Sequence, residues 1–318
     1  MQVVGLQTHI WSNNFKSMAL LAMFPAMILA LVLMIVIIFT IGGDDFLLNT
    51  VIIFIPASLV TLVLVLLWFA IAYVFNRQLI AMFTRARPLT RKEDPRIYNI
   101  VENLCISRGL PVPTIFIMDD AGMNAYASGM HPRSSLVAFS RGLLDSLDDE
   151  EIEAVAAHEL THIINRDVRL MVIAIIFVGI IQTLAEFIMR MHWFGGRSSD
   201  NDRSSGGAVL VILGIQILSF MIGYLFAVLV QLSISRKREY MADAGAVELT
   251  KKSEPLIRAL TKISQRPQVR GVANQSVAQI FFENPISERK VGFMQRIFAT
   301  HPPVADRIKA LQAYGTGA

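Results

Sequence analysis

His158-Glu159-Leu160-Thr161-His162 is the stretch that decides how this chain folds and what it can hold. Apolar residues at helical spacing surround it, so we expect it to lie within a helix. Two histidines at positions i and i+4 of a helix lie on one face, where both rings can reach one metal ion. The carboxyl group of Glu159 then lies beside that ion and can take a proton from a bound water.

The helix around this stretch should begin near Asp148, because Glu151 follows it at close to the spacing of a capping box. Its apolar stripe consists of Ile152, Val155, Ala156 and Ile163. Two histidines and a glutamate in this pattern are typical of zinc metalloproteases. The alternative is an amphipathic helix that merely carries two surface histidines, so the rest of the sequence has to decide.

The composition indicates a membrane protein, because 54% of the residues are hydrophobic and the mean hydropathy is +0.52. Four long apolar stretches account for this: Met18–Ile41, Val51–Phe75, Leu170–Ile188 and Ala208–Ile234. Each approaches or exceeds the length of about 20 residues that a helix needs to cross a hydrocarbon core. We therefore predict four transmembrane helices, with the alternative that the last two are only partly embedded in lipid.

Charges beside these stretches predict the orientation of the chain, since cytoplasmic loops carry more Lys and Arg. The turn Gly42–Thr50 contains Asp44 and Asp45 and no basic residue. Basic residues follow the second and fourth stretches, as Arg77, Arg85, Arg87, Arg91 and Lys92, and as Arg236, Lys237 and Arg238. Both termini and the paired histidines should then be cytoplasmic. The net charge is +4, and the basic residues cluster at the membrane borders. This favours anionic lipid over nucleic acid as a partner.

The soluble sequence is divided by the second apolar pair. We expect residues 1–76 to form an uncleaved anchor with two helices, and residues 168–234 to form a transmembrane hairpin. Residues 77–167 and 235–318 should together build one domain, mainly α-helical with a small β-sheet. The single cysteine, Cys105, excludes an intrachain disulfide framework and a zinc site made of several cysteines.

A catalytic zinc needs three protein ligands and one open position. After the two helical histidines, the predicted topology leaves His131, His301 and the acidic residues as candidates for the third. Geometry favours Glu239. The third and fourth apolar stretches form an antiparallel hairpin, so their cytoplasmic ends return to one place and carry Glu239 toward His162.

Asp243 follows Glu239 by four residues and should share its helix face. It is well placed to accept the second ring N–H of a zinc histidine, in the first instance His158, and to fix its tautomer. The alternative for Ser235–Asp243 is the exposed start of a helix, stabilised by surface ion pairs.

Two motifs make the chain resemble a known family: Ala157-His158-Glu159-Leu160-Thr161-His162 with Asn165-Arg166-Asp167, and Ser235-Arg236-Lys237-Arg238-Glu239-Tyr240-Met241-Ala242-Asp243. They are similar to those of the HtpX family of membrane metallopeptidases, which is related to the CAAX prenyl proteases. The resemblance implies a gluzincin-type zinc endopeptidase with one zinc ion per chain, and it places Asp167 behind the metal ligands. It also implies an inner-membrane enzyme of protein quality control and the stress response, active at the cytoplasmic face.

A further segment, Asn124-Ala125-Tyr126-Ala127, looks like the edge strand on which that family binds substrate. An extended peptide would add to this edge and be read mostly through its backbone, with Asn124 holding one backbone group. The alternative is an ordinary edge strand.

Thr300-His301-Pro302-Pro303, with Arg307 one turn later, resembles the late His-Pro motif of the family. The resemblance implies that His301 donates a hydrogen bond to the developing oxyanion and that Arg307 positions the substrate or His301. The alternative is a His-Pro turn that caps a helix.

Hydrolysis of peptide bonds in misfolded or damaged membrane proteins is therefore the expected function, with protein or peptide substrates and the lipid bilayer as partners. Site-specific processing, as in the CAAX prenyl proteases, is a second hypothesis. A non-catalytic membrane scaffold is a third. The sequence identifies no regulatory membrane partner.

Overall fold

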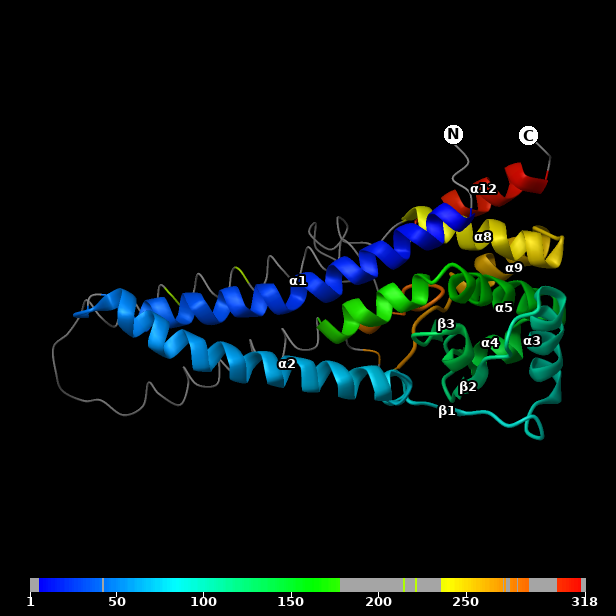
Figure 1. Cartoon of the computed structure of the whole chain (residues 1–318). Helices are drawn as coiled ribbons and strands as arrows, with labels where there is room; N and C mark the ends of the chain where they lie inside the picture. Colours follow the sequence, from blue (N-terminus) through cyan, green and yellow to red (C-terminus); the bar gives the residue numbers. More distant parts are fainter. Residues whose placement is uncertain are drawn as a thin grey trace. The chain divides into compact units, whose positions relative to one another are not determined.

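The computed structural model describes residues 6–41, 43–177, 214, 221, 236–270, 272, 275–278, 280–285 and 302–315. Their contacts divide the chain into two compact units. Unit 1 comprises Met1–Ser17, Phe75–Val172 and Gln231–Ala318, and unit 2 comprises Met18–Val74 and Ile173–Val230. The described part is mostly helical and contains one small sheet, as the sequence predicts (Figure 1).

Unit 2 contains most of helices α1 (Leu6–Thr40) and α2 (Phe46–Thr84). Thr40 and Thr50 share a hydrogen bond of 2.7 Å beside the turn that joins them. Among the described residues, two helical segments are long and apolar enough to cross a membrane, Ile10–Ile37 and Phe46–Thr84. Of the predicted third membrane helix, Leu170–Ile188, the structure describes residues 170–177, which are helical, and the rest lies outside the described residues. Of the predicted fourth, Ala208–Ile234, it describes residues 214 and 221.

A four-stranded sheet in unit 1 has the order β1-β2-β4-β3. The strands are β1 (Ala86–Pro88), β2 (Thr114–Met118), β3 (Ala125–Ser128) and β4 (Leu136–Ser140). Strands β2 and β4 pair in parallel, while β1 and β3 pair antiparallel with their neighbours. Strand β3 is therefore the last strand on one side of the sheet, which leaves its outer edge available to other parts of the chain.

Helix α5 (Asp149–Ile164) forms the centre of unit 1 and carries the paired histidines. A full capping box fixes its start, because Asp148 accepts from the backbone of Glu151 and Glu151 accepts from that of Asp148. From Ala154 to Ile163 every residue of α5 is buried. A helix that is buried all round can hold polar side chains only where other elements supply partners.

The elements around α5 supply those partners. Helix α5 contacts α3 (Pro95–Arg108), α8 (Arg236–Thr250), α9 (Glu254–Ile263) and strands β3 and β4 (Figure 1). Helix α12 (Val304–Gly315) contacts α8 and α9. The remaining short helices are η1 (Pro132–Ser134), α4 (Arg141–Ser146) and α10 (Gln275–Ala278).

Candidate metal centre

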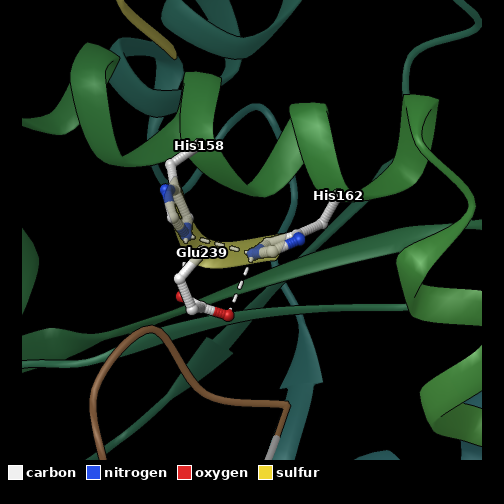
Figure 2. A group of neighbouring side chains, drawn as sticks. All are labelled: His158, His162 and Glu239. Atoms are coloured by element: carbon white, nitrogen blue, oxygen red, sulfur yellow. Dashed lines mark hydrogen bonds and ion pairs between the residues drawn. The ribbon is translucent and has the colours of Figure 1, made fainter. Parts of the chain in front are cut away.

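Three buried side chains from two helices meet at one point in unit 1. His158 and His162 project from the same face of α5 toward Glu239 of α8 (Figure 2). The Nε2 atoms of the two rings lie 3.1 Å apart. Glu239 Oε2 lies 3.7 Å from His158 Nε2, and Glu239 Oε1 lies 3.7 Å from His162 Nε2. One ligand atom from each residue lies within 4.8 Å of the others.

This donor set fits a four-coordinate metal ion. Bonds of about 2.0 Å in tetrahedral geometry place ligand atoms about 3.3 Å apart, close to the separations seen here. Two ring nitrogens that face each other in a buried site also indicate a shared cation. Three ligands leave a fourth position open, as catalytic sites require.

Glu159, the third functional side chain on α5, is 1% exposed. Its Oε1 atom is buried and has no hydrogen-bond partner among the described residues. Such an atom is costly unless something polar occupies the site with it. Burial also raises the pKa of Glu159, although the nearby His158 and His162 act in the opposite direction. A carboxyl group with a raised pKa is better suited to exchange protons near neutral pH.

Asp243 lies behind His158, on the side away from Glu239. Its Oδ1 atom is 3.0 Å from His158 Nδ1. Burial alone would lower the pKa of His158, but its contacts with Asp243 and Glu239 prevail and raise it to about 9. Burial likewise tends to raise the pKa of Asp243, and Arg307 reverses this, so that the Asp243 pKa is lowered. The structure therefore holds an ionised carboxylate against the outer nitrogen of His158, which orients the ring.

Arg307 is the cation that keeps Asp243 ionised. Its Nε and Nη2 atoms donate to Asp243 at 2.9 and 2.7 Å. A third donor, Nη1, bonds the carbonyl oxygen of Phe282 at 3.2 Å. Arg307 is 0% exposed, and its Nη1 atom also lies 3.7 Å from Glu239 Oε2. Arg307 is buried between α8 and residue 282, and its expected role in positioning the substrate or His301 stays a prediction. His301, expected to act at the oxyanion, lies outside the described residues.

Asp167 occupies the corresponding place behind His162. Its Oδ2 atom lies 3.0 Å from His162 Nδ1. The other oxygen, Oδ1, accepts a hydrogen bond of 2.7 Å from Asn13 Nδ2. Asn13 belongs to α1, 154 residues earlier in the chain, and the sequence analysis did not single it out. The available signal was a polar residue just before an apolar stretch, which by itself specifies no partner.

The outer edge of β3 is already engaged by the chain itself. Phe282 N–H donates to the carbonyl oxygen of Ala125 at 2.8 Å. Asn124 Nδ2 donates to the backbone oxygen of Glu283 at 2.7 Å, and Glu283 N–H donates to Asn124 Oδ1 at 3.2 Å. The expected open edge at Asn124 and Ala125 is thus paired with residues 282–283.

Tyr126 and Phe282 explain why this edge closes. Tyr126 pairs with Phe281 in an isolated antiparallel bridge, and its hydroxyl group shares a 2.7 Å hydrogen bond with Thr84. The Phe282 ring contacts His158 edge-on, with ring centres 4.8 Å apart. Tyr126 and Ala127 are buried, so their side chains belong to the core. The sequence analysis did not single out the apolar pair at 281–282, and the structure places Phe282 beside His158.

Known proteins that resemble this chain carry peptidase names. Residues 91–314 match Peptidase family M48. The chain is 44% identical over 324 residues to a protein named Protease HtpX homolog from Bacteroides fragilis, which covers 99% of this chain and 100% of that protein. It is 39% identical over 244 residues to the protein of the same name from Dictyoglomus thermophilum, 77% of each. Among solved structures, Ste24p of S. mikatae matches with a TM-score of 0.47 and 24% identity, over 95% of this chain and 66% of that one.

Proposed function

The chain belongs to peptidase family M48 and is a membrane metallopeptidase; we propose that it is a zinc endopeptidase that cleaves misfolded or damaged membrane proteins at the cytoplasmic face of the inner membrane. The family match confirms the resemblance read from the motifs. The observation that carries the proposal is the meeting of His158, His162 and Glu239 beside the buried carboxyl group of Glu159.

We assign His158, His162 and Glu239 as the zinc ligands. Two imidazoles and one carboxylate with an open fourth position are a donor set that catalytic zinc uses. Zinc in this site would supply Lewis acidity to the scissile carbonyl group and to the attacking water. Asp243 and Asp167 hold the outer nitrogens of the two histidines, which keeps both inner nitrogens directed at the ligand position.

Glu159 is proposed as the general base and acid. Its unpaired Oε1 accepts a proton from the attacking water, and the same carboxyl group then donates that proton to the leaving amine. His301 is proposed to donate a hydrogen bond to the developing oxyanion. Arg307 is proposed to support this chemistry through two carboxylates, since it donates two hydrogen bonds to Asp243 and its Nη1 lies 3.7 Å from Glu239 Oε2.

Substrate is proposed to bind as an extended strand along β3, at Asn124-Ala125-Tyr126-Ala127. The position of β3 at the end of the sheet supports this. The Asn124 amide already holds one backbone N–H and one backbone carbonyl group of Glu283, which is how it would hold a peptide. Residues 281–283 would have to yield the edge when a peptide binds there.

The proposed topology has four membrane helices and cytoplasmic termini. Residues 1–76 would anchor the chain, residues 168–234 would form a second hairpin, and residues 77–167 and 235–318 would form one peptidase domain. Two candidate membrane segments and the basic residues that follow the second support this arrangement. Substrates presented at the cytoplasmic face of the bilayer fit a peptidase anchored in this way.

The direct test is Glu159→Gln in the full-length protein, purified in detergent with zinc. We expect hydrolysis of an unfolded soluble protein and of a misfolded membrane protein to fall about 10²- to 10⁴-fold, because the proton carrier is lost. The zinc content should stay at one per chain, since Glu159 is not a ligand. Glu153→Gln, on the same helix, is the matched control and should retain wild-type activity.

Wild-type activity in both Glu159→Gln and Glu153→Gln would refute the catalytic role of Glu159. A prenylated peptide tested as a third substrate distinguishes site-specific processing from quality control. Cleavage confined to that peptide would replace quality control with site-specific processing.

A further inference from the structure

We propose that Asn13 is a positioning residue for the metal centre, so that the start of the first membrane helix completes the site. Asn13 acts through Asp167, which holds the ring of His162. This inference rests on the proposed role of His162 as a metal ligand and adds to it a residue from a distant part of the chain.

The hydrogen bonds form a continuous path from α1 to His162. Asn13 Nδ2 donates to Asp167 Oδ1 at 2.7 Å, and Asp167 Oδ2 lies 3.0 Å from His162 Nδ1. The two carboxylate oxygens thus have separate partners on opposite sides. A carboxylate held at both oxygens cannot rotate about its χ2 bond without losing one of them, so Asn13 fixes the direction in which Asp167 meets the ring.

Asn13 is itself held tightly. It is 1% exposed, and its Nδ2 also donates to the backbone oxygen of Asn165 at 3.0 Å. Both N–H groups of the amide are therefore used, one on the carboxylate and one on the turn that connects α5 to the following helix. Asn165 is 1% exposed and Asp167 is 0% exposed, so these bonds form away from water, where they are strong and specific.

The charge of Asp167 strengthens the hydrogen bond that it accepts from Asn13. A hydrogen bond to an ionised carboxylate is about twice as strong as one between neutral groups. Arg238, which is 5% exposed, also interacts electrostatically with Asp167. Arg238 directly precedes Glu239 on α8, so polar groups from the first and last chain segments of unit 1 converge on the carboxylate that orients His162.

The position of Asn13 in the chain links the first membrane helix to the metal centre. Residues Met1–Ser17 belong to unit 1, whereas α1 continues into unit 2 from Met18. The same helix therefore begins in the unit that holds the metal centre and continues as a candidate membrane span. Polar side chains in such a helix are costly unless they have a function, which is consistent with a buried amide at this position. The first helix is thus part of the peptidase as well as its anchor.

The test measures metal binding in the full-length protein in detergent, with Asn13→Ala, Asn13→Leu and Asn14→Ala. Leucine has the branched outline of asparagine, with greater volume and without its donors, so it serves as the second variant if the alanine variant does not fold. Asn14 is the matched control, because it is the adjacent asparagine on α1 and is not bonded to Asp167. Zinc affinity is obtained by competition with a chromophoric chelator, and ligand geometry from the visible spectrum of the cobalt-substituted protein.

We expect the Asn13 variants to bind zinc about 10- to 100-fold more weakly and to show an altered cobalt spectrum, as loss of a group behind a ligand does. The value of kcat should fall while KM stays unchanged, because Asn13 does not touch substrate. Asn14→Ala should stay within twofold of the wild type in every measurement.

Asp167→Asn and His162→Ala distinguish a failure of the positioning role of Asn13 from a failure of the metal assignment. If both weaken zinc binding while folded Asn13 variants retain wild-type affinity and spectrum, the positioning role is overturned and the proposed function stands. If His162→Ala itself retains zinc, the metal assignment fails and the role of Asn13 fails with it.

Discussion

The buried charges around Asp243 show how single residues maintain this site. Asp243 lies between the imidazole of His158 and the guanidinium of Arg307, and none of the three is more than 3% exposed. A buried carboxylate is tolerated only with compensating charge and hydrogen bonds. Arg307 provides two bonds to Asp243 and one to the backbone of Phe282, so its contribution is to stability and to orientation of His158.

Arg307→Met should lower the free energy of unfolding by about 3–5 kcal/mol, because it leaves Asp243 buried without its cation. Thermal unfolding in detergent measures this. Arg108→Met is the matched control, since Arg108 pairs with Glu248 in an exposed ion pair worth less than about 1 kcal/mol. Equal losses of stability in the two variants would contradict the importance of the buried pair.

The close contact of α5 with α8 is the element-level condition for the metal centre, because each helix carries part of the ligand set. Gly245 of α8 lies directly against Thr161 of α5. A Cβ atom there would lie 2.4 Å from Thr161 Cγ2 and 2.8 Å from Thr161 Oγ1. Thr161 directly precedes the ligand His162, so the spacing of the two helices and the spacing of the ligands are linked.

Gly245→Ala should force α8 away from α5 and cost about 1–3 kcal/mol of stability, as overpacking does. Glu239, on the same helix, would move from the two histidines, so zinc affinity should fall as well. The double variant Gly245→Ala with Thr161→Ala removes the clashing methyl and hydroxyl groups. It should recover most of the zinc affinity measured by chelator competition, and a failure to recover any would argue against this helix contact as the cause.

At the scale of the whole molecule, the chain combines a peptidase unit with helices suited to a membrane. Large apolar side chains are exposed along α2, including Leu47, Ile52, Leu59, Val63 and Leu66. Exposed apolar area of this extent is stable only when lipid or another apolar partner covers it. The charges that flank these helices then determine which side of the membrane each loop faces.

Cysteine labelling tests that orientation. Gly43→Cys lies in the turn between the first two spans, and Lys92→Cys lies after the second. A membrane-impermeant maleimide should label Gly43→Cys in right-side-out vesicles and Lys92→Cys only after permeabilisation. The native Cys105 should stay silent, because burial, aided by Glu102, raises its pKa to about 11 and it has no exposed surface. The reverse labelling pattern would contradict cytoplasmic termini.

Local sequence by itself determined the elements. The capping residues at Asp148 and Glu151 and the spacing of His158 and His162 were enough to predict helix α5 and the placement of both rings on one of its faces. The long apolar stretches at the start of the chain were predicted in the same way. These features depend on the 3.6-residue period of helices and on the length of an apolar run. Both can be read from residues that are neighbours in the sequence.

Only the tertiary structure decided which distant groups meet. It brought Asn13 to Asp167 across 154 residues, buried Arg307 against Asp243, and placed residues 282–283 on the edge of β3. Such contacts follow from how helices and strands pack, and no local periodicity encodes them. The sequence therefore defined the metal-binding helix, whereas the packing of α1, α8, α12 and β3 around it defined the environment in which that helix works.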